Sequence, residues 1–339
     1  MQLDMARVVD IELTNRCNAT CSFCPREKTP KQGFMDYDVF CKAVERVKEF
    51  GADTKVFLTG LGEPMLHPRF MECIHHLREQ GLNPAFTTNA SRLFRDKSEE
   101  LLNAGLKHID ISISDLNEKY ENVYNLDYQT TRQNIADFME LNQGRCFVQI
   151  TIVRHDGNKD DIDDMEKYWQ ATGADYVRAI REINRGGSCS KEYHFQGGDK
   201  YKKEARQALE AGGLTAVCSL PFYSVFIGWN GNYYLCCMDW EKTVPMKTVF
   251  TASIEEIDDL KYEFLQKPSA ICGACSVNPV NDICETMHEV EHGERGKFGL
   301  ANRIKALQNN EHGNFSRALE QYTRDASADG SAVIVASKV

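Results

Sequence analysis

Six short β-rich runs alternate with longer stretches of helical periodicity between residues 8 and 180, and this order limits the fold more than any other feature of the chain. Parallel strands joined by crossover helices give this alternation. The sequence therefore predicts an α/β fold of six βα units, with its chemistry at the C-terminal ends of the strands. The expected strands are Val8–Leu13, Lys55–Leu58, Pro84–Thr88, His108–Ile113, Phe147–Val153 and Asp175–Ile180. The expected helices include Tyr37–Phe50, Pro68–Gln80, Lys97–Ala104, Thr130–Leu141 and Lys159–Thr172.

Length and charge narrow the class of protein. A chain of 339 residues is longer than most single domains, so we expect one large domain and a smaller one. The net charge of −10 and the lack of a Lys/Arg-rich run argue against nucleic-acid and anionic-membrane partners and favour a small polar substrate. No apolar run approaches the roughly 20 residues that span a bilayer, and the N-terminus has no apolar signal core. We expect a soluble cytoplasmic protein whose 13 cysteines stay reduced, so that the clustered ones bind metal.

Three cysteines follow the first expected strand with the spacing C-x3-C-x2-C, namely Cys17, Cys21 and Cys24. A [4Fe–4S] cluster takes four thiolates, so a loop with three leaves one iron open to a small-molecule ligand. A zinc half-site at Cys21 and Cys24 is the alternative. The next possible zinc ligand is Cys41, which lies in a helical pattern, so the cluster is favoured.

This loop, with the aromatic Phe23 before its third cysteine, resembles the radical S-adenosylmethionine (SAM) superfamily. The resemblance implies a (β/α)6 partial TIM barrel. It also implies that the amino and carboxylate groups of SAM chelate the open iron, and that the reduced cluster cleaves SAM to a 5′-deoxyadenosyl radical. A flavodoxin- or ferredoxin-type protein is then the expected reductant.

A second motif, Gly60-Leu61-Gly62-Glu63-Pro64, follows the second expected strand. Glycines at a strand end let the backbone approach a ligand, and a carboxylate there can bind an ammonium group. The motif is similar to the GGEP motif of radical SAM enzymes, except that Leu61 replaces its first glycine. The resemblance implies that Gly62, Glu63 and Pro64 hold the methionyl amine of SAM.

Three further SAM-binding residues are expected after later strands. Asn89 lies in Thr87-Thr88-Asn89-Ala90, which is similar to the TTNG motif of the family, and Ser112 lies where the family places a polar residue near the ribose. Both residue types are also common caps and turn residues. Arg185 precedes two glycines after the sixth strand, where it can grip the SAM carboxylate or a substrate oxygen, or form a solvated salt bridge.

A second group of cysteines lies in the C-terminal part of the chain: Cys218, Cys236, Cys272 and Cys275. Four thiolates in this spacing bind either zinc or a [4Fe–4S] cluster. The pattern resembles the twitch domain, a short form of the SPASM domain, in radical SAM dehydrogenases and epimerases of aminoglycoside pathways. It implies a second [4Fe–4S] cluster. The remaining thiols are interpreted as buried or core residues, with cluster ligation left open for the first two: Cys237, Cys284, Cys41, Cys73 and Cys146.

These motifs divide the chain into a barrel over 1–187, a linker over 188–217 and an auxiliary-cluster domain of α+β type over 218–290. The linker is expected to hold a helix at Lys200–Ala211, and the auxiliary domain a hairpin around Asn230-Gly231 followed by a helix from Ile254 to Gln266. A polar helical region begins near Glu285 and occupies 291–324, and a tail over 325–339 is expected to be disordered.

The resemblance also suggests a reaction. Cys189 lies in a glycine-rich stretch after the sixth strand, and some related epimerases use a cysteine thiol to return a hydrogen atom to a substrate radical. A surface-loop thiol is the alternative. We expect hydrogen abstraction from a carbinol or amine-bearing carbon of a sugar or aminocyclitol, followed by epimerisation through Cys189 or dehydrogenation through the auxiliary cluster.

Two other functions remain open. A peptide maturase that forms a crosslink or thioether commonly has a peptide-recognition domain before its barrel, whereas the first strand here starts by residue 8. A non-catalytic iron–sulfur partner protein would not need the intact C-x3-C-x2-C loop.

Overall fold

Six parallel strands in chain order form most of a nine-stranded sheet in the computed structural model, which describes residues 8–29, 31–51, 54–189, 200–267, 269–292 and 299–328. The sheet order is β6-β5-β4-β3-β2-β1-β7-β8-β9. All six expected strands are confirmed within two residues: β1 Val8–Ile11, β2 Lys55–Leu58, β3 Pro84–Thr88, β4 His108–Ser112, β5 Phe147–Arg154 and β6 Tyr176–Arg181. The α/β fold of six βα units predicted from the alternation is therefore confirmed, together with the partial barrel that the family resemblance implied.

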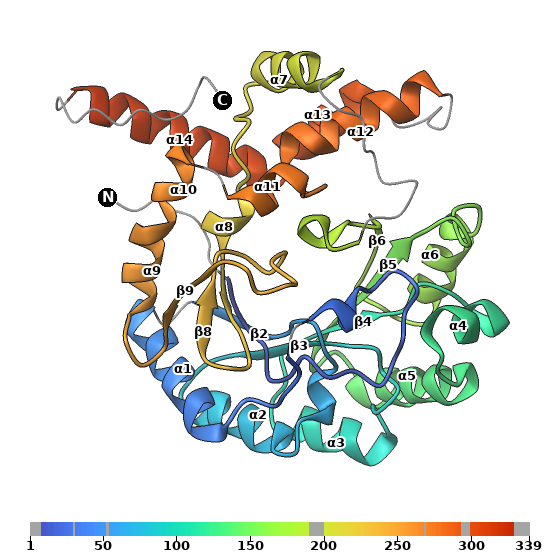
Figure 1. Ribbon diagram of the computed structural model, residues 1–339. Helices are drawn as coiled ribbons and strands as arrows, with labels where there is room; N and C mark the ends of the chain where they lie inside the picture. Colours follow the sequence, from blue (N-terminus) through green and yellow to red (C-terminus); the bar gives the residue numbers. More distant parts are fainter. Residues whose placement is uncertain are drawn as a thin grey trace.

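Helices follow one another around the outside of these strands (Figure 1). Five of them correspond to expected helices: α1 Tyr37–Phe50, α2 Phe70–Glu79, α3 Arg95–Asn103, α5 Tyr128–Asn142 and α6 Ile162–Ala171. The sequence reasoning missed α4, Asn117–Tyr124, because this short helix buries only Tyr120 and Tyr124 and so has little apolar periodicity. The five expected helices surround the sheet on its outward side (Figure 1).

Alternation along the strands separates a hydrophobic outer face from a polar inner face. On β4, Ile109 and Ile111 are fully buried in the main core, whereas His108, Asp110 and Ser112 line an inner cavity. The same alternation on β5 buries Val148, Ile150 and Ile152 and turns Gln149 and Thr151 inward. The core thus holds the strands against the helices, and the interior of the barrel is left for polar side chains.

The C-terminal part of the chain extends the same sheet. The expected hairpin is confirmed as β7 Ser224–Ile227 and β8 Asn232–Tyr234, which pair antiparallel around Gly231 at φ 77°. β9, Pro245–Thr248, adds a third strand. β7 also pairs in parallel with β1, in the register Val9↔Val225. The auxiliary domain predicted to begin at residue 218 therefore shares the barrel's sheet.

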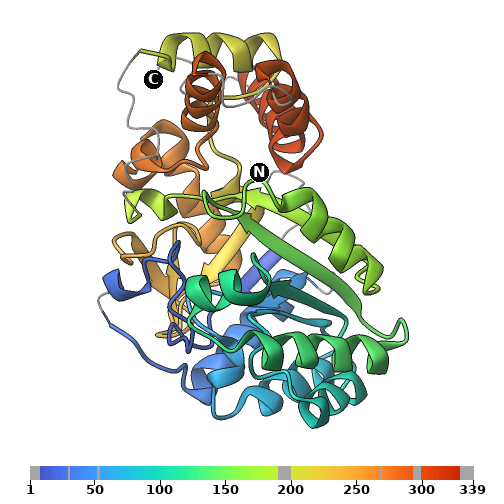
Figure 2. The same ribbon diagram turned by 90° about the vertical axis from the view of Figure 1, so that its right-hand side faces the viewer.

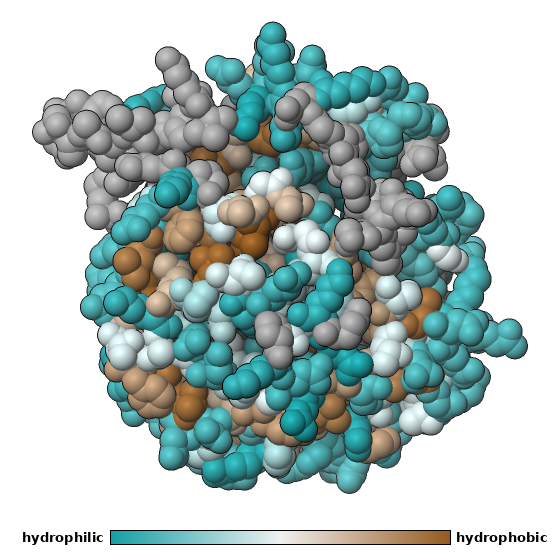
Figure 3. Space-filling view, in the orientation of Figure 1, coloured by the Kyte–Doolittle hydropathy of each residue, from teal (hydrophilic) through white to brown (hydrophobic). Residues whose placement is uncertain are grey.

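Most of the remaining helices lie together on one side of the barrel, whereas α9, Ile254–Lys261, lies beside α1 (Figures 1 and 2). The others are α7 Lys202–Ala211, α8 Leu220–Tyr223, α10 Glu263–Gln266, α11 Ala270–Ala274, α12 Pro279–Glu291, α13 Leu300–Gln308 and α14 Glu311–Ala328. In the space-filling view, hydrophobic side chains gather beneath these helices, while most of this face is hydrophilic (Figure 3). No helix in the described ranges is both long and apolar enough to cross a bilayer.

Two expectations about this region are corrected. The segment 188–217 is more than a linker, because α7 packs against α12 and buries Ala205 and Leu209 in a small second core. The disordered tail does not begin at residue 325, since α14 continues through Ala328. The rest of that tail, 329–339, lies outside the described residues.

Candidate active site

A cavity of about 500 Å³ opens inside the partial barrel, a size within the range of small-molecule sites. The three cysteines of the first loop line it, with five of the six residues expected to bind SAM: Gly62, Glu63, Asn89, Ser112 and Arg185. The sixth, Pro64, starts a 3-10 helix over Pro64–Leu66 and is not part of the lining. The residues predicted from separate motifs thus converge on one cavity.

The cysteine loop after β1 is held by backbone hydrogen bonds to α4. The amides of Thr20 and Ser22 donate to the carbonyls of Tyr124 and Val123, at 3.0 and 3.1 Å. The Ala19 amide points at Cys17 Sγ, 3.4 Å away. Because α4 has few apolar residues, its role in the site is one that sequence reasoning could not find.

Burial is the main influence on the ionisation of this loop. It raises the pKa of the Cys17 thiol to about 11, and the neighbouring Cys24 adds to the rise. The pKa of Cys21 is raised by burial and then by Cys24 and Cys17, so the three thiols are close enough to affect one another. Iron supplies the positive charge that such a cluster of buried thiolates lacks.

Gly62 and Glu63 connect the cysteine loop to the end of β2. The Glu63 amide donates to the Arg16 carbonyl at 2.9 Å. A Cβ on Gly62 would lie only 2.3 Å from the same carbonyl oxygen and 2.5 Å from that of Thr14. Only glycine allows this close approach, so the second motif supports the loop that carries the cluster ligands.

The Glu63 carboxylate is buried and accepts three hydrogen bonds. Its oxygens accept from Met65 N at 3.1 Å, Thr88 Oγ1 at 2.9 Å and Asn89 N at 2.8 Å. Burial raises its pKa to about 7, and these hydrogen bonds oppose the rise. Glu63 therefore fixes the end of β3 as well as lining the cavity.

Asn89 reaches from the end of β3 to the cysteine loop. Its side-chain amide donates to Asn18 Oδ1 at 3.1 Å and lies 3.8 Å from Cys17 Sγ. Hydrogen bonds to cysteine sulfur tune the reduction potential of iron–sulfur clusters. Asn89, which is expected to bind SAM, thus also contacts the loop that carries the cluster cysteines.

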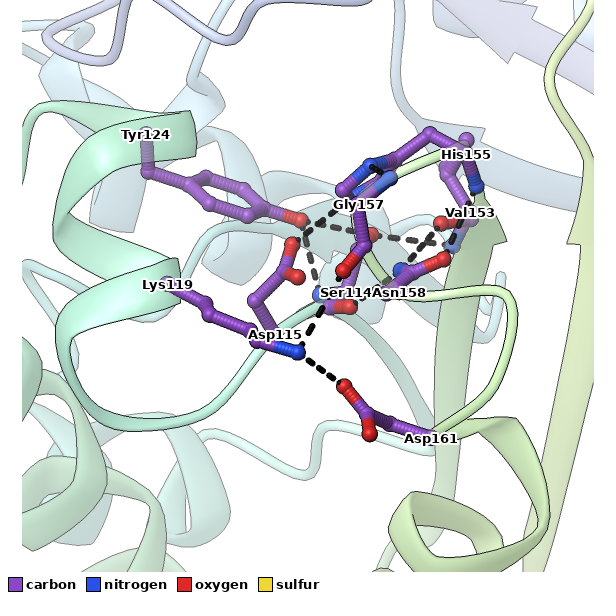
Figure 4. A network of polar contacts seen from close by, with 9 residues as sticks. All are labelled: Ser114, Asp115, Lys119, Tyr124, Val153, His155, Gly157, Asn158 and Asp161. Atoms are coloured by element: carbon purple, nitrogen blue, oxygen red, sulfur yellow. Dashed lines mark hydrogen bonds and ion pairs between the residues drawn. The ribbon is translucent and has the colours of Figure 1, made fainter.

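A buried polar network supports the other side of the loop (Figure 4). Tyr124 OH donates to Ser114 Oγ at 2.8 Å, and Ser114 Oγ accepts from Val153 N at 2.9 Å. His155 Nε2 lies 2.8 Å from Asp115 Oδ2, and its ring packs 6.0 Å from that of Phe23, centroid to centroid. The ends of β4 and β5 are therefore tied to the aromatic residue between the second and third cysteines.

Arg185 lies on the wall that faces the auxiliary cysteines. Its guanidinium stacks 4.9 Å from the Trp240 ring, and both residues line the cavity. Among the described residues, neither Arg185 Nε nor Trp240 Nε1 has a hydrogen-bond partner, although both atoms are buried. Sequence reasoning missed Trp240, which no spacing links to the barrel.

The four auxiliary cysteines are surrounded by backbone amides. Met238 N donates to Cys236 Sγ at 3.2 Å. Burial raises the pKa of Cys218 and Cys272, and the amides of Leu220 and Ser269 oppose the rise. Amides of Val277, Gly186 and Asn278 do the same for Cys275. Donors aimed at sulfur suit thiolates that ligate a cluster.

No group of three Cys, His, Asp or Glu side chains in the described part of the chain is arranged around a single metal ion. A [4Fe–4S] cluster distributes its four cysteines over four irons, so its ligands need not converge on one point.

The remaining thiols differ in their surroundings. Cys73, Cys146 and Cys284 are buried as expected, but Cys41 is half-buried. Cys237 is not a buried thiol either, because it is half-buried and lines the cavity beside the auxiliary cysteines.

Cys189 is buried next to the cysteine loop, so the surface-thiol alternative is wrong. Its Sγ lies 3.6 Å from the Phe23 carbonyl oxygen. The neighbouring Ser188 carbonyl accepts a hydrogen bond from Lys28. Cys189 is not part of the cavity lining that the described residues form. Residues 190–199, which follow it, lie outside the described residues.

Arg181 serves the fold. Its guanidinium pairs with Asp282 and, at 2.9 Å, with Glu285, both on α12. These carboxylates raise its pKa against the effect of burial. Arg181 thus joins the end of β6 to the C-terminal helices and is not available to SAM.

Two family models match consecutive parts of the chain. The model of the radical SAM superfamily matches residues 11–168. That of an iron–sulfur cluster-binding domain, SPASM, matches residues 218–276, which include all four auxiliary cysteines.

Individual relatives match less of their own length. A GTP 3′,8-cyclase of Thermodesulfovibrio yellowstonii is 28% identical over 214 residues, which are 59% of this chain and 63% of the relative. The chain spans less than two thirds of the length of this relative, and the same holds for a cofactor-modifying protein of Pyrococcus furiosus and a probable GTP 3′,8-cyclase of Methanococcus vannielii.

Two solved structures share the fold. BtrN in complex with AdoMet and 2-DOIA has a TM-score of 0.51 at 16% identity, over 81% of this chain and 94% of BtrN. SuiB of Streptococcus suis bound to its precursor peptide SuiA has a TM-score of 0.60 at 12% identity, over 81% of this chain and 71% of SuiB. By these family models, residues 11–168 form a radical SAM domain, which implies a [4Fe–4S] cluster and SAM as cofactors, and residues 218–276 form a SPASM domain, which implies further iron–sulfur ligation.

Proposed function

We propose that this enzyme abstracts a hydrogen atom from a hydroxyl- or amine-bearing carbon of a sugar or aminocyclitol. The cluster and SAM, when bound, supply the 5′-deoxyadenosyl radical. The chain supplies the orientation of the two reactants and a pocket that excludes water. A flavodoxin- or ferredoxin-type protein is the proposed reductant.

One observation carries this proposal: the same cavity holds the cluster loop and a polar inner wall. Glu63, Asn89 and Ser112 lie at the strand ends beside the cysteines. Asp110, Thr151 and Arg178 line the barrel below them. Polar side chains inside a barrel suit a substrate with several hydroxyl or amine groups, because each group must find a partner once water is excluded.

A radical on the bound substrate can react in two ways. If a thiol gives its hydrogen atom to the opposite face of the carbon, the product is the epimer, and the thiyl is restored by one electron from the reductant and one proton from solvent. If a radical on a hydroxyl-bearing carbon loses a proton and an electron, the product is a ketone, whereas an amine-bearing carbon gives an imine. The auxiliary cluster is the expected acceptor of the electron. Cys189 is the proposed donor, and the contact of its Sγ with the Phe23 carbonyl of the cluster loop supports this proposal.

The reaction in deuterium oxide distinguishes these outcomes. With Cys189 as donor, the wild type places one solvent deuterium at the inverted carbon, and Cys189→Ala still forms 5′-deoxyadenosine but loses the epimer. Cys41→Ala serves as the control, since Cys41 lies on the outward helix α1. Ketone formation without solvent deuterium in both wild type and Cys189→Ala would assign dehydrogenation instead. A crosslinked peptide product would favour the maturase alternative over both.

A further inference from the structure

Four side chains on neighbouring strands form a hydrogen-bonded wall inside the cavity. Asp110 on β4 accepts from Gln149 Nε2 and Thr151 Oγ1 on β5, both at 2.7 Å. Arg178 on β6 donates to Thr151 Oγ1 at 3.0 Å and to Asp110 Oδ2 at 3.2 Å. All four line the cavity. Because the wall pairs a carboxylate with a guanidinium, it offers both acceptors and donors and carries no net charge.

Asp10 on β1 lines the same cavity but has no such partner. No side chain or amide in the described residues donates a hydrogen bond to its carboxyl group, in contrast to Asp110. The nearest cation is Lys261 on α9, which is 1% exposed. Lys261 donates to the Ser224 carbonyl at 2.9 Å and lies 3.6 Å from Asp258. Its charge is therefore shared with another carboxylate.

The surroundings of Asp10 compensate its negative charge only in part, through Lys261. The side chain is reached from the cavity, and protein surrounds it elsewhere, so desolvation raises its pKa from 3.8 to about 7 while Lys261 opposes the rise. A buried carboxylate without a partner is costly unless a ligand supplies a cation or donors.

A second unpartnered group lies at the same depth. His108 also lines the cavity, and its Nε2 is buried without a hydrogen-bond partner among the described residues. Its ring lies between those of Phe57 and Phe147, at centroid distances of 4.9 and 5.1 Å. The inner end of the cavity therefore contains two polar groups that the protein itself does not satisfy.

The position of these groups fits a substrate below SAM. Asp110 precedes Ser112, the expected ribose contact, by two residues on the same strand face. Two residues along a strand correspond to about 7 Å. The space between the wall and the SAM-binding residues is continuous, because both sets line one cavity.

We propose that Asp10 binds an ammonium group of the substrate and that the Asp110–Arg178 wall binds its hydroxyl groups, so that the substrate is a small polyhydroxylated amine rather than a neutral sugar. This inference rests on the proposed function, of which it specifies the substrate class. A neutral polyol would satisfy the wall and leave the Asp10 charge unpaired. An amine on the same ring supplies the missing cation.

Two matched probes test the proposal: scyllo-inosamine and scyllo-inositol, which differ by one amine in place of one hydroxyl. Binding to the anaerobically reconstituted enzyme with SAM, without reductant, is measured by isothermal titration calorimetry. Because an ammonium group forms a charged hydrogen bond with the Asp10 carboxylate, the wild type should prefer the amine by at least about ten-fold. Asp10→Asn should bind both probes within about two-fold of each other, and Asp10→Glu should regain part of the preference.

The control is Asp156→Asn, which removes an equal charge from an exposed site and should keep the wild-type preference. Equal binding of the two probes by the wild type, a preference that survives in Asp10→Asn, or no binding of the amine would each overturn the role of Asp10. These results concern binding alone. The proposed function fails separately, if no hydrogen is transferred from any sugar or aminocyclitol, even where the amine preference is found.

Discussion

Gly62 shows how much a single residue contributes to the cluster loop. A methyl group there would lie 2.3 Å from the Arg16 carbonyl oxygen, a contact that backbone must move to relieve. That backbone carries Cys17. Close packing leaves no space for the shift, so a small substitution acts on the nearest cluster ligand.

Gly62→Ala should therefore lose the SAM-cleaving cluster and keep the auxiliary one. Anaerobic reconstitution should give about four irons per chain in place of about eight, since each [4Fe–4S] cluster has four. Gly299→Ala is the matched control, because an added Cβ meets nothing within 4 Å there. About eight irons and normal SAM cleavage in Gly62→Ala would contradict the close contact.

Glu63→Gln tests the carboxylate beside the same loop. Its oxygens accept from Met65, Thr88 and Asn89, and a glutamine NH2 cannot accept, so at least one donor loses its partner at a cost of about 1 to 3 kcal/mol. We expect SAM binding to weaken by about ten-fold with unchanged iron content, measured by equilibrium binding. Glu79→Gln, on the exposed side of α2, is the control. Wild-type affinity in Glu63→Gln would remove this residue from the SAM site.

Sequence spacing located residues that lie close together along the chain and missed those that only folding brings together. Cys17, Cys21 and Cys24 could be found because one loop carries all three. Trp240 could not be found, because it meets Arg185 across the predicted domain boundary. Asp10 could not be found either, because a single polar residue within an apolar strand carries no signal of its own. The partners of a side chain are set by the register of distant strands, and no local pattern encodes them.

At the scale of elements, the strands were predicted well because buried parallel strands form short apolar runs. α4 was missed because it buries only Tyr120 and Tyr124 and so shows little apolar periodicity. The pairing of β7 with β1 was also missed, because a hairpin signal fixes the partner within the hairpin and not the strand on its other side.

The helix α14 offers a pH-dependent test at this scale. His312 near its start lies with Nε2 2.9 Å from the Thr215 carbonyl oxygen, and burial lowers its pKa below 6.5. A group with a lowered pKa in the folded state stabilises the fold fully above pH 6.5, and this contribution is lost as the pH falls below that value. The thermal unfolding midpoint should therefore decrease between pH 7 and pH 5.5.

His312→Gln separates this residue from the other buried histidines, His67 and His108, whose pKa values are also lowered. The glutamine amide can still donate to Thr215 but does not titrate, so the decrease with falling pH should be smaller in the variant. An identical pH dependence in wild type and His312→Gln, by anaerobic circular dichroism melts, would exclude His312 as a contributor.

At the scale of the whole molecule, one sheet joins the two cluster-binding regions. β7 lies beside β1, and the loop after β8 brings Cys237 and Trp240 to the cavity that the first cysteine loop also lines. Arg181 and Asp282 fasten the C-terminal helices to β6. The domain division predicted from the sequence separates the two sets of cysteines, whereas one continuous sheet spans both regions of the chain.

The central claim is that this cavity directs the 5′-deoxyadenosyl radical to a carbon of a sugar or aminocyclitol. The most direct measurement is mass spectrometry of 5′-deoxyadenosine after turnover with ring-deuterated scyllo-inosamine, beside a panel of deuterated amino sugars and sugars. We predict that one deuterium moves from a substrate carbon into 5′-deoxyadenosine, and that a variant with Ala at Cys17, Cys21 and Cys24 forms none. Formation of 5′-deoxyadenosine without deuterium from every member of the panel, or continued SAM cleavage by the triple variant, would contradict the account.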